Sequence, residues 1–383
     1  MMKRVGILTI HNSPNYGASL QSYALYKYVS QLPGIECEVI DLHRPYENGY
    51  VKSNRFVPYR REPFSIKRFI KSALKKILRR ESKKVSFYSI GAKYKFDEFN
   101  KCIKLSRPYW GIDELYADPP CYDVYMTGSD QVWNPTQPYC LEPYFLTFAP
   151  QDKKKLSYAS SIGVTELLEN EKKDFKRWLS SYDAISVREY QAKDLLTSFV
   201  DRPVTQVADP TFLLNSVYWR NLAVDYQKAE PYILLFTVGF DSNLLQFAIK
   251  ISNESGLRLI YLNQKLSEPI DGTYKVMNDA GPRDFLGLIA QSEMVITDSY
   301  HATVFSLILK AKNFYAYIGS YNKRGSRILD LLKTYKGEAH LLSEALSENY
   351  TDLSKREIDY QLVDRIYREE QMKAYDFLKS NLL

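Results

Sequence analysis

The sequence lacks the features that define several large protein classes. Its longest apolar runs, such as 232–236 and 294–296, fall far short of a membrane-spanning helix. The start MMKRVGILTI is followed too soon by the polar HNSPN to be a secretory signal, so we expect a cytoplasmic protein. The four cysteines, at positions 37, 102, 121 and 140, form no CxxC pair and no Cys/His cluster with zinc spacing. We therefore expect neither a disulfide framework nor a metal.

Several catalytic and binding signatures are also missing. The sequence has no GxSxG, no HExxH and no glycine-rich kinase loop. These absences argue against serine hydrolases, zinc peptidases and kinases. No recognised nucleic-acid-binding module is present either, so we expect no nucleic-acid partner.

The overall composition is that of a globular protein with one basic region. A chain of 383 residues, 45% hydrophobic and 25% charged, is long enough for two cores. Much of the net charge of +7 comes from residues 52–95, where FIKSALKKILRR (69–80) has apolar residues at helical spacing. This stretch suits an anionic membrane surface, and its plain alternative is a solvated helix that caps a domain.

Strand-like and helix-like runs alternate along most of the chain, which predicts a mostly parallel sheet in each of two halves. Expected strands in the first half are 4–10, 37–42, 122–128, 155–162, 184–187 and 204–208, with helices over 19–32 and 166–182. After a hinge near 213–226, the expected strands are 232–238, 257–262, 294–297 and 313–318, with helices over 242–255, 285–291, 302–310 and 326–335. We thus expect Rossmann-like domains at 1–215, with a basic insertion at about 50–95, and at 216–350, followed by a helical segment, 351–383, that packs back on the first.

Distinctive polar side chains follow the ends of these expected strands. They are His11, Asn15, Ser129, Asp130, Gln131, Arg188, Asp209, Ser299 and His301. Ligands of open parallel sheets bind beyond the carboxyl ends of the strands. The pattern therefore predicts a binding cleft between the two halves.

Two stretches of the first half have both a functional and a structural interpretation. In NYGASLQSYAL (15–25), Gly17 permits close approach of a ligand and the helix start attracts an anion, or Asn15 simply caps a turn. In GSDQVWNP (128–135), Asp130 can bind hydroxyls or act as a base, and Trp133 can stack on a sugar ring. The structural alternative is that Asp130 caps a turn and Trp133 belongs to the core.

Three further candidate stretches contain basic side chains. Arg188 follows a short apolar strand, where its fork suits a carboxylate or phosphate, or pairs with Glu189. His301, in TDSYHATVFSLI, suits a general acid/base or a hydrogen bond to phosphate, or it is an ordinary histidine at a helix start. KRGSRILDLL (323–332) offers an anion clamp or a plain basic helix start.

The ordered set of NYG, GSDQVWNP, SVRE with DPTFLL downstream, TDSYHA and KRGSRI resembles the polysaccharide pyruvyl transferase family, from about residue 5 to 332. The resemblance implies an α/β, glycosyltransferase-B-like fold of two Rossmann-like domains facing a cleft. It also implies transfer of pyruvate from phosphoenolpyruvate to a sugar, galactose being one candidate, as a cyclic ketal in bacterial surface polysaccharide biosynthesis. No cofactor is expected beyond phosphoenolpyruvate as donor substrate.

The resemblance also assigns roles to residues. The catalytic candidates are His301, Asp130 and Arg188; the donor-binding candidates are Arg188, Ser299, Tyr300, His301, Lys323, Arg324 and Arg327; the acceptor-binding candidates are His11, Asn15, Tyr16, Gly17, Ser129, Asp130, Gln131 and Trp133. Before its histidine the family usually has arginine and leucine, where this chain has Ser299 and Tyr300. We expect Lys323, Arg324 or Arg327 to replace the missing arginine.

The carrier of the acceptor sugar is left open between a nucleotide and a lipid. The basic residues 52–95 favour a lipid-linked acceptor at the inner face of the cytoplasmic membrane. The sequence is also compatible with two functions other than pyruvyl transfer. One is a nucleotide-sugar-dependent glycosyltransferase of the same fold, and the other is a non-catalytic glycan-binding relative.

Overall fold

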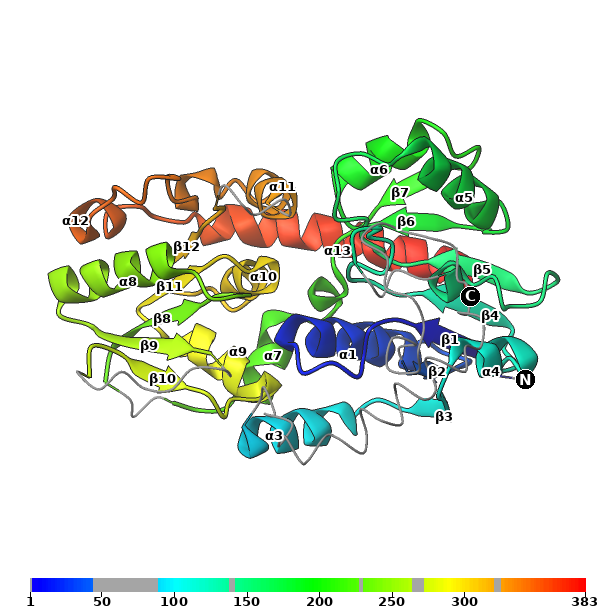
Figure 1. The fold of residues 1–383 in the computed structure, drawn as a ribbon, viewed down its shortest axis with the longest axis horizontal. Helices are drawn as coiled ribbons and strands as arrows, with labels where there is room; N and C mark the ends of the chain where they lie inside the picture. The colour runs from blue at the N-terminus through cyan, green and yellow to red at the C-terminus, as the bar shows by residue number, and fades with distance from the viewer. Residues whose placement is uncertain (1, 44–88, 138–141, 227–229, 264–271, 320–324) are drawn as a thin grey trace, which may run out of the picture.

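Two five-stranded parallel sheets, one in each half of the chain, form the framework of the protein (Figure 1). The computed structural model describes residues 2–43, 89–137, 142–226, 230–263, 272–319 and 325–383. The first sheet has the order β3-β2-β1-β4-β5 and the second the order β10-β9-β8-β11-β12. All strand pairs within them are parallel, which confirms the expected α/β class.

The elements of the first half are the strands β1 (Lys3–Leu8), β2 (Ile35–Leu42), β3 (Leu105–Tyr109), β4 (Val124–Thr127), β5 (Lys154–Ser157), β6 (Ile185–Val187) and β7 (Val204–Gln206), the helices α1 (Tyr16–Ser30), α3 (Ile90–Asn100), α4 (Ile112–Ala117), α5 (Glu169–Leu179) and α6 (Tyr190–Thr197), and the 3-10 helices η2 (Glu142–Phe145) and η3 (Pro210–Leu213). β6 and β7 form a small sheet that isolated bridges join to the segment after β4, at Leu156–Ala184 and Ser160–Val187. The ends of β6 and β7 thus lie beside those of the main sheet.

The elements of the second half are α7 (Ser216–Leu222), β8 (Tyr232–Phe236), α8 (Ser242–Ser255), β9 (Arg258–Leu262), β10 (Lys275–Met277), α9 (Pro282–Gln291), β11 (Met294–Thr297), α10 (Tyr300–Ile308), β12 (Phe314–Ala316), α11 (Ser326–Thr334), η4 (Glu338–His340), α12 (Tyr350–Leu353) and α13 (Tyr360–Leu382). The central strands β8 and β11 are almost fully buried, as expected for parallel strands covered by helices on both faces.

The helices α1 and α10 begin earlier than the sequence pattern predicts, and both starts matter for the site. α1 starts at Tyr16 because the Asn15 side chain accepts a hydrogen bond from the Ala18 amide. α10 starts at Tyr300 because Ser299 caps it in the same way, through the Ala302 amide. The loop from β11 to α10 is residues 298–299 alone, whereas residues 9–15 connect β1 to α1.

The two halves share one apolar cluster and are tied by α13. Tyr16 at the start of α1 stacks on Phe285 of α9, with ring centroids 4.7 Å apart. The helix α13 runs from the second half back to the first (Figure 1), where Tyr375 stacks on Tyr28 of α1 at 4.8 Å. Packing of this kind fixes the halves against each other.

The basic stretch is described only at its end. Residues 52–88 lie outside the described residues, and α3 follows them and packs on α9, where Lys95 forms an ion pair with Asp284 at 3.3 Å. Of the helices that the structure describes, none combines the length and the apolar character needed to cross a bilayer.

Candidate functional site

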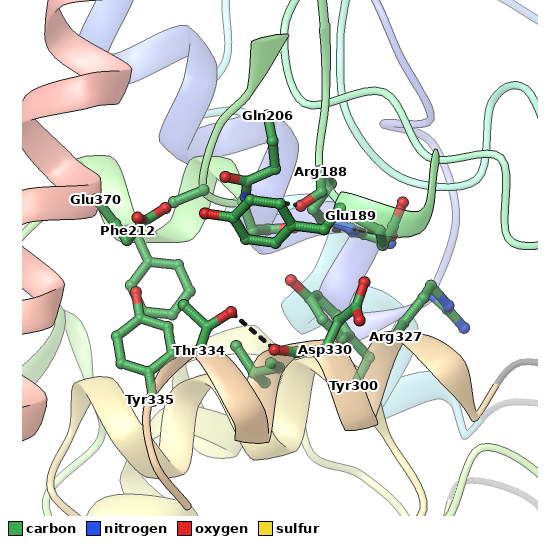
Figure 2. Close-up of a pocket in the computed structure, with 14 residues that line it drawn as sticks. Arg188, Glu189, Gln206, Phe212, Tyr300, Arg327, Asp330, Thr334, Tyr335 and Glu370 are labelled. Atoms are coloured by element: carbon green, nitrogen blue, oxygen red, sulfur yellow. Dashed lines mark hydrogen bonds and ion pairs between the residues drawn. The ribbon is translucent and has the colours of Figure 1, made fainter. Parts of the chain in front are cut away.

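A pocket lies where β6, β7 and η3 of the first half face α10 and α11 of the second, with α13 along one side (Figure 2). It is lined by Arg188, Glu189, Tyr190, Gln206, Ala208, Asp209, Phe212, Tyr300, Arg327, Asp330, Leu331, Thr334, Tyr335 and Glu370. The pocket thus lies between the halves, beyond the carboxyl ends of β6 and β7, where a ligand site is expected in a sheet of this kind.

Arg188 is held at this edge by two carboxylates. Its Nε donates to Glu189 Oε1 at 2.9 Å and its Nη1 donates to Asp209 Oδ2 at 2.8 Å, with the side chain 1% exposed. Burial alone would lower the pKa of Arg188, but the two carboxylates outweigh it and raise the pKa well above the usual value. The expected pairing with Glu189 exists, yet Nη2 has no hydrogen-bond partner among the described residues.

Asp209 connects the arginine to the histidine of the other half. Its Oδ2 lies 3.6 Å from His301 Nε2, slightly beyond a hydrogen bond, and its Oδ1 accepts from the Thr211 amide. Burial alone would raise the pKa of Asp209, but His301 and Arg188 outweigh it and hold the pKa well below its usual range. One ionised carboxylate therefore positions two donor groups from opposite sides of the cleft.

Tyr300 separates two guanidinium groups. The Cζ atoms of Arg188 and Arg327 lie 4.3 Å and 5.6 Å from the centroid of its ring. Burial lowers the pKa of Arg327, and the nearby charge of Arg188 lowers it further. Glu189 and Asp209 offset the charge of Arg188, whereas no described carboxylate forms an ion pair with Arg327, so a bound anion would offset the charge of Arg327.

Unsatisfied polar atoms concentrate at this place. The structure describes eight buried side-chain N or O atoms with no partner, and six of them are Arg188 Nη2, Glu189 Oε2, His301 Nε2, Arg327 Nε, Tyr335 OH and Glu370 Oε2. Five of these six side chains line the pocket, and the sixth, His301, lies beside Asp209. Since buried polar groups are normally bonded, this concentration marks a ligand site.

The NYG turn lies against the same histidine. A Cβ added at Gly17 would lie 2.1 Å from His301 Nδ1, so only glycine allows the first turn of α1 to approach this closely. Asn15 serves as the helix cap, and the Tyr16 hydroxyl donates to the Ala280 carbonyl of the other half. The structure therefore places these three acceptor candidates at the seam between the halves.

The GSDQVWNP stretch divides into one residue near the site and three inside the first half. Asp130 has a positive φ of 70°, and its charge acts on both Arg188 and Arg327. Trp133 is fully buried, stacks on Phe145 and donates to the Tyr144 carbonyl, so its ring is not open to a sugar. Its burial corrects the expectation of sugar stacking, and the core alternative describes it.

The remaining neighbours of Asp130 are bonded within the first half. Ser129 donates to the Ala159 carbonyl at 2.7 Å, and Gln131 accepts from the Asn134 amide at 2.6 Å. Both side chains are buried.

Of four other candidates, two form local hydrogen bonds and two lie outside the described residues. His11 is buried and bonds Asp41 at 3.0 Å, and Ser299 uses its hydroxyl as the α10 cap. Lys323 and Arg324 lie outside the described residues. Arg327 is thus the member of the KRGSRI set that the structure brings to the pocket.

The sequence pattern did not indicate the far end of the pocket. Tyr335 follows α11 and Glu370 belongs to α13, and neither stands after an expected strand. From the sequence alone, each would be interpreted as an ordinary helix residue that either packs in the core or faces solvent. Only the crossing of α13 over the seam brings Glu370 to the pocket.

Comparisons with known proteins agree with this architecture. No curated protein matches the sequence significantly. Similar solved structures include a glycotransferase of kitacinnamycin (10% identity, 100% of both chains covered, TM-score 0.52). A putative UDP-N-acetylglucosamine 2-epimerase from Listeria monocytogenes (12% identity, 99% of this chain and 95% of that chain, TM-score 0.52) is similar as well.

A third similar structure is the UDP-GlcNAc 2-epimerase of Methanocaldococcus jannaschii with UDP-GlcNAc and UDP (12% identity, 96% and 99% covered, TM-score 0.51). At these identities the likeness shows the fold alone, which is glycosyltransferase-B-like as expected. The sequence profile of the polysaccharide pyruvyl transferases matches residues 15–315, so the chain belongs to the polysaccharide pyruvyl transferase family.

Proposed function

We propose that the protein transfers pyruvate from phosphoenolpyruvate to two hydroxyls of a sugar and forms a cyclic ketal. The observation that carries this proposal is that three buried donor atoms, on Arg188, His301 and Arg327, converge at the seam between the halves and have no hydrogen-bond partner in the described part of the chain. Phosphoenolpyruvate has a phosphate and a carboxylate, so it matches several donors held close together. Family membership supports the reaction type.

The reaction needs a proton for the vinyl carbon of the donor, which creates oxocarbenium character at the carbon bearing the phosphate. One sugar hydroxyl attacks this carbon, the phosphate leaves, and a second hydroxyl closes the ketal. The two hydroxyl protons balance the new methyl group and the released hydrogen phosphate. The site must therefore supply an acid, a base and cations for the donor's charges.

The side chains at the seam fit these needs. In our proposal Arg188 binds the donor's carboxylate or phosphate through the free end of its fork. His301 supplies the proton or contacts the phosphate, and Asp130 orients or deprotonates the acceptor. Arg327 replaces the arginine that the family usually has at the position of Ser299. It thus gives the KRGSRI stretch a role in binding the donor.

The test uses Arg327→Met. Since Arg327 Nε has no partner and burial lowers the pKa of this group, removing the charge should raise the free energy of unfolding by about 1 kcal/mol. The same change should weaken phosphoenolpyruvate binding about 10- to 100-fold, because a charge-assisted contact is lost. Calorimetric titration and urea denaturation measure the two effects.

The matched control is Arg258→Met, because Arg258 pairs with Glu230 at the amino end of β9, and the pocket lies beyond the carboxyl ends of the strands. It should leave donor binding unchanged. Incubation with phosphoenolpyruvate and galactose-, mannose- or glucosamine-containing acceptors, read by mass, should give the ketal and phosphate. A wild-type protein that binds UDP- or GDP-sugars and not phosphoenolpyruvate would overturn the proposal.

The carrier of the acceptor belongs to the same proposal. We propose a lipid-linked acceptor because of the basic composition of residues 52–95. Replacing Lys75, Lys76, Arg79 and Arg80 by neutral residues should lower turnover of a lipid-linked acceptor and leave a soluble one unaffected. Equal activity of this variant on both acceptors would remove the lipid assignment.

A further inference from the structure

The pocket has two chemically different ends. Figure 2 shows Arg188, Glu189, Tyr300 and Arg327 toward one end, and Phe212, Tyr335 and Glu370 at the other. The first end carries the two guanidinium groups. The second end is formed by the turn after α11, by η3 and by α13, and the mechanism above uses none of its side chains.

Glu370 presents one carboxylate oxygen to the pocket. Its Oε1 accepts from Lys373, one turn further along α13, while its Oε2 is buried with no partner in the described part of the chain. The residue is 5% exposed. A buried carboxylate oxygen without a hydrogen-bond donor destabilises the ligand-free protein. A ligand that donates a hydrogen bond to this oxygen would therefore bind favourably.

Tyr335 presents a hydroxyl beside it. The ring stacks on Phe212 with centroids 5.2 Å apart and planes at 8°, which fixes the direction of the hydroxyl. The residue is 3% exposed, and its hydroxyl bonds to no described group. Burial raises the pKa of Tyr335 well above its usual value, and the charge of Glu370 raises it further, so the phenol keeps its proton and can donate.

A donor and an acceptor that both lack a described partner, in one buried pocket, favour a ligand group that can accept and donate. A hydroxyl accepts from Tyr335 and donates to Glu370. A phosphate or carboxylate would be repelled by Glu370, and the arginine end already suits it. Neighbouring sugar hydroxyls have the required chemistry, and ketal formation needs them beside the donor.

We propose that Tyr335 and Glu370 form a hydroxyl-binding subsite that holds the sugar acceptor next to the donor. This inference rests on the proposed function, because it takes the arginine end as the donor site. It makes α13 a part of the acceptor site as well as a tie between the halves. Both side chains act as positioning residues.

The decisive variant is Tyr335→Phe. It removes an oxygen that has no partner, so the ligand-free protein should melt at the same or a higher temperature. The Kd for phosphoenolpyruvate should stay within about twofold, whereas the KM for the acceptor should rise about tenfold with a smaller change in kcat. The acceptor is the galactose-, mannose- or glucosamine-containing glycoside that the wild-type protein converts.

Glu370→Gln is the second variant, and it should raise the same KM while phosphoenolpyruvate still binds. The matched control is Tyr232→Phe, since the Tyr232 hydroxyl is buried in the second half and donates to the Leu288 carbonyl at 2.8 Å. This control should lower the melting temperature and leave the acceptor KM unchanged. Tyr335→Phe should therefore change the acceptor KM without lowering the melting temperature, and Tyr232→Phe should do the reverse. This contrast distinguishes a hydroxyl that contacts the ligand from one that stabilises the fold.

The outcomes separate the subsite from the function. If wild-type protein binds phosphoenolpyruvate and forms the ketal, but Tyr335→Phe and Glu370→Gln keep the wild-type acceptor KM, the subsite is wrong and an enclosed water is its only occupant. If wild-type protein neither binds phosphoenolpyruvate nor forms a ketal, the transferase proposal and the subsite fall together.

Discussion

Asp298, directly after β11, illustrates how one partly buried carboxyl changes the pH dependence of stability. Burial raises its pKa to about 6, although its Oδ1 accepts a hydrogen bond from the Val238 amide at 2.7 Å. Between about pH 3.9, the usual aspartate pKa, and about pH 6, the unfolded chain has lost this proton and the folded protein keeps it. The contribution of Asp298 to the free energy of unfolding is therefore lost as the pH rises through this window.

Asp298→Asn should remove that loss, since the amide oxygen can still accept from Val238 and never ionises. We expect the variant to be more stable than wild type by about 1–2 kcal/mol at pH 7.5, discounted for partial solvation, and by about 0.5 kcal/mol or less at pH 4. Urea denaturation of both proteins at these pH values measures the difference. An equal difference at the two pH values would contradict the assigned pKa.

A site residue could be predicted from the sequence when its neighbours along the chain determine its position in the fold. Arg188 and His301 follow apolar strands, so the strand-end rule placed both near the cleft. Trp133 was a candidate because of the residue types in GSDQVWNP, and residue type cannot distinguish a side chain that turns into the core from one that faces a ligand. Glu370 was missed because its position depends on the crossing of α13, which no local pattern encodes.

At the scale of elements, α13 holds the backbone that carries Asp209. The Tyr367 hydroxyl donates to the carbonyls of Phe212 at 3.0 Å and Leu214 at 2.9 Å, on either side of the end of η3. Asp209 caps the start of this same short helix through the Thr211 amide. The site thus depends on a helix that contacts it from the far end of the chain.

Tyr367→Phe should lower the free energy of unfolding by about 1 kcal/mol, because the Leu214 carbonyl loses its side-chain donor, whereas the Phe212 carbonyl still accepts from Gln371 Nε2 at 2.8 Å. Phosphoenolpyruvate binding should weaken by less than in Arg327→Met, since Asp209 is loosened and no charge is removed. The control is Tyr94→Phe on α3, where the side chain is exposed. Stability of Tyr367→Phe equal to that of the control would show that α13 does not support η3.

Elements with a strong apolar pattern were predicted closely, including the buried edge strands β5 and β12, whereas the exposed edge strands were not. The predicted helix 242–255 is α8 and the predicted strand 294–297 is β11, both with a clear apolar pattern. The strands β3 and β10 were missed, since they lie at the edges of their sheets and expose much of their length. An edge strand is stabilised by one neighbour, so its sequence is less constrained.

At the scale of the molecule, the site exists only because the halves meet closely at two helix starts. The start of α1 faces the start of α10, and Gly17 leaves the space that the His301 ring fills. Tyr16 stacks on Phe285 one residue before Gly17, so the same turn also builds the apolar seam. The contact that joins the halves is therefore also the contact that orients the histidine.

Gly17→Ala tests this coupling. In an ordinary helix the change would stabilise by about 0.5–1 kcal/mol, but here the new Cβ would meet the His301 ring, so we expect a loss of about 1–3 kcal/mol and weaker phosphoenolpyruvate binding. In a His301→Ala background the same change should be neutral or stabilising, because the ring is gone. Gly239→Ala is the control, since nothing lies within 4 Å of its added Cβ. Urea denaturation of the four proteins of the cycle gives the coupling energy, and an equal cost of Gly17→Ala in both backgrounds would show that the two helix starts are independent.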